Sequence, residues 1–146
     1  MEPVTRERLE QVMEVVRSAA RQLVGADGVT LVLRDGDDCL YMEEDAISPL
    51  WKGRRFPMRL CISGWVMTLA SPVVIPDVFL DARIPRDAYA PTFVRSMAMV
   101  PIGKERPIGT IGAYWDTPGY EATQGQIETL LALADSAALT LEPGDT

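Results

Sequence analysis

The chain has 146 residues, 47% of them hydrophobic, and it contains no histidine. This length fits one domain of about 100–150 residues, and the apolar content supplies a core without a metal or disulfide staple. The net charge of −7 disfavours nucleic acid as a partner, because that binding rests on cationic contacts to phosphates. Without histidine, Ser-His-Asp and Cys-His catalysis, histidine-ligated haem and a phosphoacceptor histidine are excluded for this chain.

The cysteines and the apolar runs indicate in which cellular compartment we expect the protein. The two cysteines, Cys39 and Cys61, lie 22 positions apart and form no CxxC pair. Because no signal-like segment opens the sequence, reduced thiols in a cytoplasmic protein are the simplest interpretation. No apolar run approaches the roughly 20 residues that span a bilayer, and we expect no membrane insertion.

The first half of the chain predicts a helix, a hairpin and a long loop. Apolar residues recur at three- and four-residue spacing over residues 5–24, which predicts an amphipathic helix with Thr5 as N-cap and Gly25 just past its end. Its predicted apolar stripe comprises Leu9, Val12, Met13, Val16, Ala20 and Leu23. Alternating runs at 28–35 and 38–44, joined by Asp-Gly-Asp, predict a β-hairpin, and a long structured loop follows.

The second half predicts shorter elements and a closing helix. Residues 59–78, "RLCISGWVMTLASPVVIPDV", predict a helix that starts at its cysteine and then a β-branched strand. Proline breaks over residues 78–97 predict short helices. Runs at 97–102 and 108–115 predict a second hairpin, and residues 124–141 predict a final amphipathic helix. The predicted class is α+β, with the terminal helices on one face of a mostly antiparallel sheet.

Four motifs, in this order, resemble the GAF domain family across nearly the whole chain. They are "GADGVTLVLRDGDDCLY", "ISGWVMTLASPVVIPDV", "DARIPRDAYAPTFVRSMAMVPI" and "PIGTIGAYW". Within that family, "SPLWKGRRFP" and "CISGW" are similar to the N-terminal sensory GAF domains of bacterial sensor histidine kinases. The resemblance implies that residues 1–146 form a single GAF domain belonging to a longer signalling protein.

The resemblance also implies a fold and a site. A six-stranded antiparallel sheet (GAF/PAS-like) would carry the terminal helices on one face and pocket-forming loops and short helices on the other. Two copies would form a homodimer through the terminal helices, and a linked C-terminal output domain, such as a histidine kinase, would receive the signal. The ligand would be an unknown small molecule, with an anion as one candidate. Candidate pocket residues are Trp51, Phe56, Cys61, Trp65, Asp77, Tyr89, Phe93, Arg95 and Trp115.

Three classes of function follow from the resemblance. We expect a non-catalytic sensory or regulatory domain. The alternative is a pure dimerisation or interaction module whose pocket is filled by its own side chains, so an open cavity would favour the sensor and a closed one the module. The third class is a thiol-dependent free methionine sulfoxide reductase. Its pattern needs more cysteines than the two present and a resolving thiol, for which Cys39 is not obviously placed.

Two ligand-specific GAF patterns are absent. In photoreceptor GAF domains the cysteine that holds a linear tetrapyrrole typically precedes a histidine, whereas Ile62 follows Cys61. We therefore expect no covalent bilin and interpret Cys61 as a small buried residue, the alternative being a thiol made reactive by the helix N-terminus. Cys39 has no special neighbours in the sequence. The chain has no asparagine, so the Asn-Lys pattern of cyclic-nucleotide-binding GAF domains is also missing.

Charged residues leave two alternatives open. Candidate ligands for a hard cation are the carboxylates Glu43, Glu44 and Asp45 and, more loosely, Asp77, Asp81 and Asp87. We favour a solvated acidic rim for the first three and helix- or turn-starting roles for the aspartates, and expect no metal site. Candidates for an anion site beside Trp51 and Phe56 are Lys52, Arg54, Arg55, Arg83, Arg86 and Arg95. Otherwise these cations balance surface acids.

Overall fold

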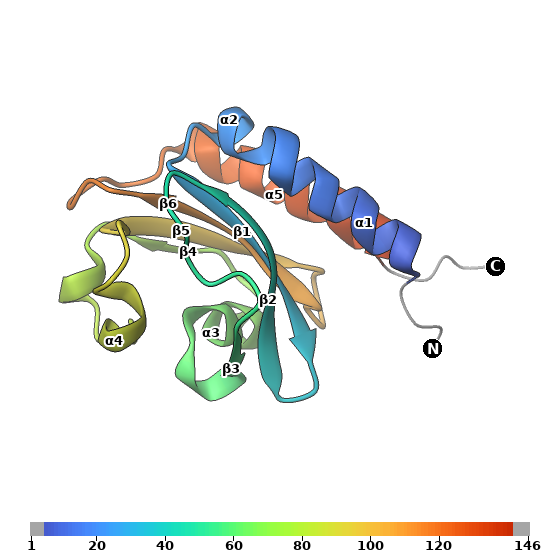
Figure 1. Cartoon of the computed structure of the whole chain (residues 1–146), viewed down its shortest axis with the longest axis horizontal. Helices are drawn as coiled ribbons and strands as arrows, with labels where there is room; N and C mark the ends of the chain where they lie inside the picture. Colours follow the sequence, from blue (N-terminus) through green and yellow to red (C-terminus); the bar gives the residue numbers. More distant parts are fainter. Residues whose placement is uncertain (1–4, 142–146) are drawn as a thin grey trace.

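Six antiparallel strands form one sheet in the computed structural model, which describes residues 5–141 (Figure 1). In chain order they are β1 (Gly28–Asp35), β2 (Asp38–Ala46), β3 (Arg55–Pro57), β4 (Val73–Ile75), β5 (Ser96–Ile102) and β6 (Gly109–Trp115). The order across the sheet is β3-β2-β1-β6-β5-β4, and each neighbouring pair is antiparallel. The α+β class and both predicted hairpins, β1–β2 and β5–β6, are confirmed.

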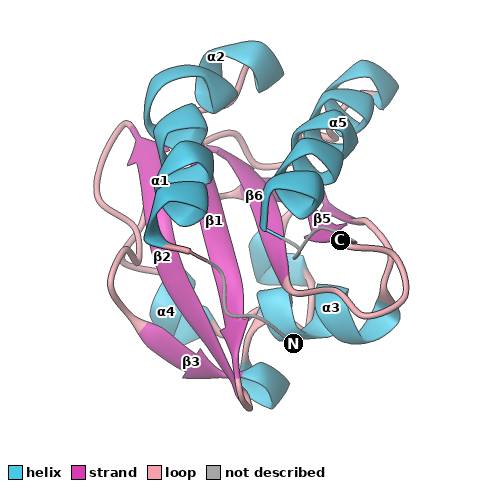
Figure 2. Ribbon diagram, turned by 90° about the vertical axis from the view of Figure 1, so that its right-hand side faces the viewer, coloured by secondary structure: helices cyan, strands magenta, loops and turns pink. Residues whose placement is uncertain are grey.

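The two terminal helices lie on one face of this sheet (Figures 1 and 2). α1 (Arg6–Val15) continues through a π-helical turn, η1 (Val16–Ala20), into α2 (Arg21–Val24), so the predicted first helix is one continuous element. Thr5 caps it by accepting the Arg8 N–H at 3.2 Å, and Gly25 ends it in the left-handed region at φ 76°. α5 (Gln124–Leu141) has the predicted bounds.

The π-helical turn changes which residues of the first helix are buried. Its buried positions are four residues apart, at Val12, Val16, Ala20 and Val24. In a regular helix of 3.6 residues per turn, a four-residue repeat drifts by about 40° at each step. The wider turn at η1 absorbs that drift, so Val24 meets the core. The prediction that Leu23 belongs to the buried stripe is wrong, because its side chain is 61% exposed.

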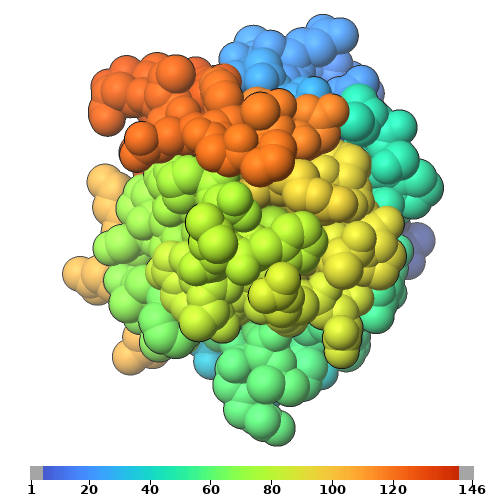
Figure 3. All heavy atoms as spheres, turned by 90° about the vertical axis from the view of Figure 1, so that its left-hand side faces the viewer, coloured from blue at the N-terminus to red at the C-terminus, as the bar shows by residue number. Residues whose placement is uncertain are grey.

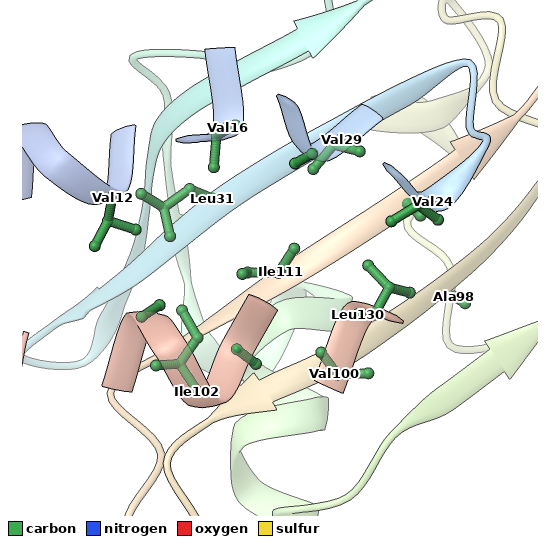
Figure 4. Close-up of a cluster of buried hydrophobic side chains, with 14 of the residues drawn as sticks. Val12, Val16, Val24, Val29, Leu31, Ala98, Val100, Ile102, Ile111 and Leu130 are labelled. Carbon is green, nitrogen blue, oxygen red and sulfur yellow. The ribbon is translucent and has the colours of Figure 1, made fainter. Parts of the chain in front are cut away.

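Strand alternation separates two hydrophobic cores, one on each face of the sheet. The first core lies beneath the terminal helices and includes Val29, Val100 and Leu130 (Figure 4). The second core lies on the opposite face, beneath the short elements η2 (Met58–Leu60), α3 (Ile62–Leu69), η3 (Val78–Leu80) and α4 (Arg86–Tyr89). On β5, Val100 belongs to the first core and its neighbour Met99 to the second. The short helices predicted before β5 are present.

A β-bulge in β2 redirects two glutamates. Leu31 on β1 pairs with Glu43, whereas the next residue, Val32, pairs with Tyr41, so one residue of β2 has no partner. Directly paired residues share a face of the sheet. The bulge therefore places Glu43 on the face of the terminal helices, while Glu44 points to the opposite face together with Tyr41.

Candidate functional site

The face of the sheet opposite the terminal helices carries the candidate pocket. It is covered by α3, by the loop between β2 and β3 (residues 47–54) and by the segment that runs from β4 to β5. Figure 3 shows the green and yellow atoms of this segment closely packed at one end of the molecule. Any ligand on this face would have to lie between the sheet and these covering elements.

Aromatic side chains fill the space beneath this cover. The Trp51 ring centroid lies 5.6 Å from that of Tyr41, 4.7 Å from Tyr89 and 5.4 Å from Tyr114. These four side chains are fully or almost fully buried, and Phe56 adds a further edge contact to Tyr41 at 5.5 Å. The cavity left beside Tyr41, Trp51, Phe56 and Tyr89 measures about 10 Å³. That volume holds about one water molecule, whereas small-molecule sites measure roughly 300–1,000 Å³.

The polar atoms of these aromatic residues are paired within the protein. The Tyr41 hydroxyl lies 3.0 Å from Ser63 Oγ, and the Tyr114 hydroxyl lies 2.9 Å from Thr30 Oγ1. The Trp51 Nε1–H donates to the carbonyl of Ala88 at 3.0 Å. Burial raises the pKa of both tyrosines, so they stay neutral donors and acceptors. In this conformation the Tyr41–Ser63 contact joins the sheet to α3, the Trp51–Ala88 bond joins two parts of the cover, and the Tyr114–Thr30 contact lies within the sheet, so these groups are engaged inside the protein rather than open to a ligand.

The structure brings four of the predicted pocket residues together. Trp51, Phe56, Cys61 and Tyr89 all line the same small cavity. They come from the β2–β3 loop, β3, the start of α3 and α4, which are separated in the sequence but meet over the sheet. These four residues therefore share one cavity, and its role as a ligand pocket stays a prediction. The filled state of the pocket is the one expected for an interaction module.

The other five candidates lie elsewhere. Trp65 is 47% exposed on the outer side of α3. Asp77 caps η3, Phe93 packs at the edge of the second core, and the Arg95 guanidinium donates to nearby backbone carbonyls. Trp115 belongs to the first core, on the face of the terminal helices. It follows Tyr114 on β6, which faces the second core, and neighbouring residues of a strand face opposite sides of the sheet. These residues do not form one site.

Sequence reasoning missed Tyr41, Tyr114 and Ser63 as parts of the pocket region. The signal for Tyr114 was present in the strand pattern, since neighbouring residues on a strand face opposite sides and Trp115 follows it. Tyr41 carried a similar signal, two residues after the buried Cys39 on β2. Ser63 had no local signal, because its role depends on meeting the Tyr41 hydroxyl across the pocket.

Both cysteines are buried in the second core. Cys61 is the N-cap of this helix, and its Sγ accepts the Gly64 N–H at 3.4 Å, which confirms the helix start predicted there. The Cys39 thiol donates to Met58 Sδ at 3.5 Å. This contact is tertiary, because Met58 lies 19 positions away and Cys39 has no special neighbours in the sequence. Strand pairing and the loop after β3 join residues that no local pattern connects.

Their surroundings change the acidity of the two thiols in opposite directions. The neighbouring Cys39 thiol lowers the pKa of the Cys61 thiol, and the backbone N–H groups of Gly64 and Ser63 lower it further against the effect of burial. The influence of Cys61, together with burial, raises the pKa of Cys39.

The acidic set on β2 is engaged by cations and backbone groups of the protein. Glu43 is 1% exposed and pairs with Arg17 at 2.8 Å and Lys52 at 2.7 Å. Burial raises the pKa of Glu43, but these two cations outweigh it and the net pKa is below the ordinary value. Asp45 pairs with Arg21 at 3.3 Å. The expectation of a solvated acidic rim is wrong for Glu43, because the bulge turns it beneath the first helix.

Glu44 holds the loop that carries Trp51. Its carboxylate accepts the backbone N–H groups of Leu50, Trp51 and Lys52, each at 2.8 Å. Within residues 5–141, no group of three or more acidic, cysteine or histidine side chains is placed to hold a metal ion. The aspartates act as predicted, since Asp77 caps η3 and Asp81 accepts the Arg83 N–H at 2.9 Å.

The arginines do not converge on one anion site. Arg55 pairs with Asp35 at 2.6 Å and Arg83 with Asp81 at 2.7 Å. The remaining guanidinium groups stack on aromatic rings: Arg54 over Phe56, and Arg86 and Arg95 over Phe79. Of the two interpretations that the sequence left open, the arrangement favours cations that are engaged individually.

A second concave feature lies on the other side of the molecule. An apolar groove of about 200 Å³ runs between α1 and α5, with Ile111 of β6 among its lining residues. Val15 of α1 lines it and is 43% exposed, and Ser136 of α5 lines the opposite wall. Among the described helices, none is both long enough and apolar enough to cross a membrane.

The sheet order, the terminal helices on one face and the covered opposite face define a GAF-like sensory fold. The model of the GAF domain family matches residues 8–141, and the chain belongs to this family. No curated protein matches the sequence.

Solved structures agree on the fold. The PixJ GAF domain of Thermosynechococcus elongatus, in its blue-light absorbing form, is 17% identical with a TM-score of 0.77, over 93% of this chain and 88% of that one. The GAF-B domain of DevS from Mycobacterium smegmatis is 19% identical with a TM-score of 0.70, over 90% of both chains. The free methionine-R-sulfoxide reductase of Neisseria meningitidis is 20% identical with a TM-score of 0.69, over 92% and 86%. At these identities the likeness concerns the fold alone.

Proposed function

We propose that this chain is a regulatory GAF domain that acts by self-association through the groove between α1 and α5. The observation that carries the proposal is the contrast between the apolar groove, about 200 Å³, and the aromatic cavity, about 10 Å³. The larger hollows beside Trp65, along the outer side of α1 and beside the β5–β6 loop are more open to solvent than the groove. The exposed side chain of Val15 lies beside the groove. In a two-fold dimer each copy offers both a projecting side chain and a groove to the other, which gives a self-complementary surface.

The same helices connect the proposed interface to the sheet. α5 lines the groove and packs on β5 and β6 through Leu130 and Ala134, so a change in helix packing reaches the strands. We infer that this change is passed to an output domain of the same signalling protein. The similarity of residues 48–57 and 61–65 to the GAF domains of sensor histidine kinases supports a kinase as that output. The free thiols support a reducing compartment, the cytoplasm.

Oligomeric state, measured by light scattering over a range of concentrations, tests the proposal. We expect a dimer that Ser136→Arg dissociates, because the two-fold axis would bring a pair of like charges into an apolar groove. Leu139→Arg is the matched control. Leu139 is on the same helix and 83% exposed, but it lies toward the β5–β6 loop rather than the groove. A wild-type chain that stays monomeric at every concentration, or a dimer equally weakened by both variants, would overturn the proposal.

A second candidate is a small-molecule sensor in which Trp51 occupies the ligand position. The observation in its favour is that Trp51 comes from a loop rather than from the sheet, so the indole can leave the pocket when the three backbone N–H bonds to Glu44 break. A ligand would have to displace this indole and bind the conformation in which the loop is open. A native mass spectrum of the purified chain separates the candidates. A bare dimer supports the interaction module, and a dimer with additional non-covalent mass supports the sensor.

We propose that the chain is not an enzyme. A cavity of about 10 Å³ does not admit an amino acid such as methionine sulfoxide. We therefore expect no turnover of free methionine sulfoxide with a dithiol reductant present. Turnover by the wild-type chain that Cys61→Ser abolishes would show instead that the pocket opens to a substrate and that the domain is catalytic.

A further inference from the structure

A hollow of about 430 Å³, the α3 hollow, lies where α3 meets η2 and the β1–β2 turn. It shares no lining residue with the aromatic cavity or with the groove between α1 and α5, so the proposed self-association does not involve it. Its volume falls within the roughly 300–1,000 Å³ of small-molecule sites. The hollows along α1 and beside the β5–β6 loop are lined mostly by charged side chains and have no aromatic wall. The α3 hollow has one.

Apolar side chains form the larger part of its wall. Trp65 and Leu69 lie one turn apart on α3 and line the hollow together with Met58 of η2. About half of the Trp65 and Leu69 side chains is exposed, whereas Trp51 and Trp115 are buried. Apolar surface that stays in contact with water keeps its burial free energy available for binding. Trp65 is therefore the tryptophan that a ligand reaches from solvent.

The Trp65 indole is held in place before a ligand binds. The Arg83 guanidinium lies 5.9 Å from the centroid of the ring, which is within the range of a cation–π contact. Arg83 is fixed in turn by the carboxylate of Asp81, to which it donates its Nε–H at 3.0 Å and an Nη2–H at 2.7 Å. A ring positioned in this way loses little conformational freedom when a second ring packs against it.

Two guanidinium groups supply positive charge at the same hollow. Arg34 comes from β1 and Arg59 from η2, and neither was among the predicted candidates for an anion site. The Arg34 Nε–H donates to the carbonyl of Gly36 at 3.1 Å, so this side chain is oriented by its own hairpin turn. Within residues 5–141, no carboxylate forms an ion pair with Arg34 or Arg59. Their terminal N–H groups are available to a ligand.

The charge of the hollow selects the anion. Asp37 lines it with the two arginines, so two cations and one carboxylate leave one net positive charge. A phosphate group, with about −1.5 to −2 charges near neutral pH, would meet the like charge of Asp37. A single carboxylate matches the hollow. We propose that the α3 hollow binds a small aromatic molecule with one carboxylate group, its ring against Trp65 and its carboxylate on Arg34 and Arg59.

Titration of the full chain with 3-phenylpropanoate, followed by calorimetry, tests the proposal. The matched probe is 3-phenylpropanamide, which has the same ring and no charge. We expect the carboxylate to bind with a Kd below about 1 mM, and the amide to bind at least about tenfold more weakly because it makes no charge-assisted hydrogen bonds. Backbone amide signals in a two-dimensional NMR spectrum should shift at residues 34–37 and 58–69. A Kd of the carboxylate above that value, equal affinities of the two probes, or shifts confined to the surroundings of Trp51 would overturn the proposal.

Single variants assign the contacts. Arg34→Gln and Arg59→Gln should each weaken binding of the carboxylate by about five- to tenfold and leave that of the amide unchanged. Trp65→Ala should weaken binding of both probes by about tenfold, because both place a ring against the indole. Asp37→Asn should strengthen binding of the carboxylate by about threefold, since it removes a like charge.

Arg106→Gln is the matched control. Arg106 is an exposed arginine on the β5–β6 loop and lines a different hollow, so its substitution should leave both affinities unchanged. Circular dichroism checks that each variant is folded, and the two wild-type titrations decide the proposal if one is not. Equal losses of affinity in Arg106→Gln and Arg34→Gln would mean that the carboxylate is attracted by cations in general, which would contradict a site at α3.

Discussion

Gly64 and Met58 pack backbone against backbone: a Cβ built on Gly64 would lie 1.8 Å from the Met58 carbonyl oxygen. Because of this contact, the first turn of α3 lies directly against η2. The contact also explains why residue 64 of "CISGW" is a glycine. The neighbouring atom belongs to the main chain, so no side-chain rotation can relieve an added methyl group. The position of α3 over the sheet therefore depends on the absence of a side chain at residue 64.

Gly64→Ala should lower the free energy of unfolding by about 3 kcal/mol or more, because the helix must shift away from η2. Urea denaturation measures the change. Gly125→Ala is the control, since its nearest contact is Thr123 Oγ1 at 3.9 Å and alanine favours the helix, with an expected gain of about 0.5 kcal/mol. If both substitutions had the same sign and size, the close contact at Met58 would not exist.

Trp51→Ala should destabilise the fold by about 3–5 kcal/mol, because it removes a buried indole that contacts three tyrosines. The vacated space should accept indole as a ligand, as apolar cavities in proteins accept benzene. We expect indole to raise the thermal midpoint of the variant and to leave that of the wild type unchanged. No response of a folded Trp51→Ala variant to indole would mean that the cover collapses into the space.

Glu43→Gln should destabilise the chain near neutral pH by about 2 kcal/mol, because Arg17 and Lys52 lose their common anion. The pKa of Glu43 is lower when folded than the unfolded value of about 4.3. The stabilisation is therefore fully present above pH about 4.3 and is lost as the pH falls through the folded pKa. Urea denaturation of both chains at several pH values should show the difference shrinking in acid.

Glu10→Gln is the matched control for that comparison. Glu10 pairs with the same Arg17, but its side chain is 57% exposed. Exposed ion pairs contribute about 0–1 kcal/mol, so we expect a change within about 0.5 kcal/mol at neutral pH. Equal effects of the two substitutions would show that burial of Glu43 is not what makes its ion pairs stabilising.

Tyr114→Phe should cost about 1–2 kcal/mol, since it leaves the fully buried Thr30 hydroxyl without its partner at 2.9 Å. Combining it with Thr30→Val removes both polar groups together. The double variant should then lose less stability than the sum of the two single variants, because no buried hydroxyl is left unpaired. Strictly additive losses in a double-mutant cycle would contradict the hydrogen bond.

Local signals made most of the fold predictable. Thr5, Gly25 and the Asp-Gly turn mark element ends through their own backbone preferences, so the helix and hairpin bounds follow from the sequence. β3 lay within the predicted loop, because three residues become a strand only by pairing with β2, as Phe56 does with Cys39. Pairing of this kind is tertiary and leaves no local pattern.

The candidate site was less predictable for the same reason. The burial of Glu43 follows from an unpaired residue in β2, which no composition or spacing reveals. The Cys39–Met58 contact joins β2 to η2 across 19 positions. By contrast, the separation of Trp115 from the pocket was available from strand alternation with Tyr114. The sequence pattern predicted the helices and strands themselves, but it did not predict the contacts between them.

The π-helical turn at Val16–Ala20 also bears on how this helix tolerates changes of length. A π-turn holds one residue more than the α-helical turn it replaces. Deleting one residue there would restore a regular helix and leave the segments before and after it facing the sheet as they do now. Elsewhere in the helix the same deletion would rotate one segment by about 100° relative to the other. Relatives of this domain that are one residue shorter are therefore expected to carry the gap at this turn.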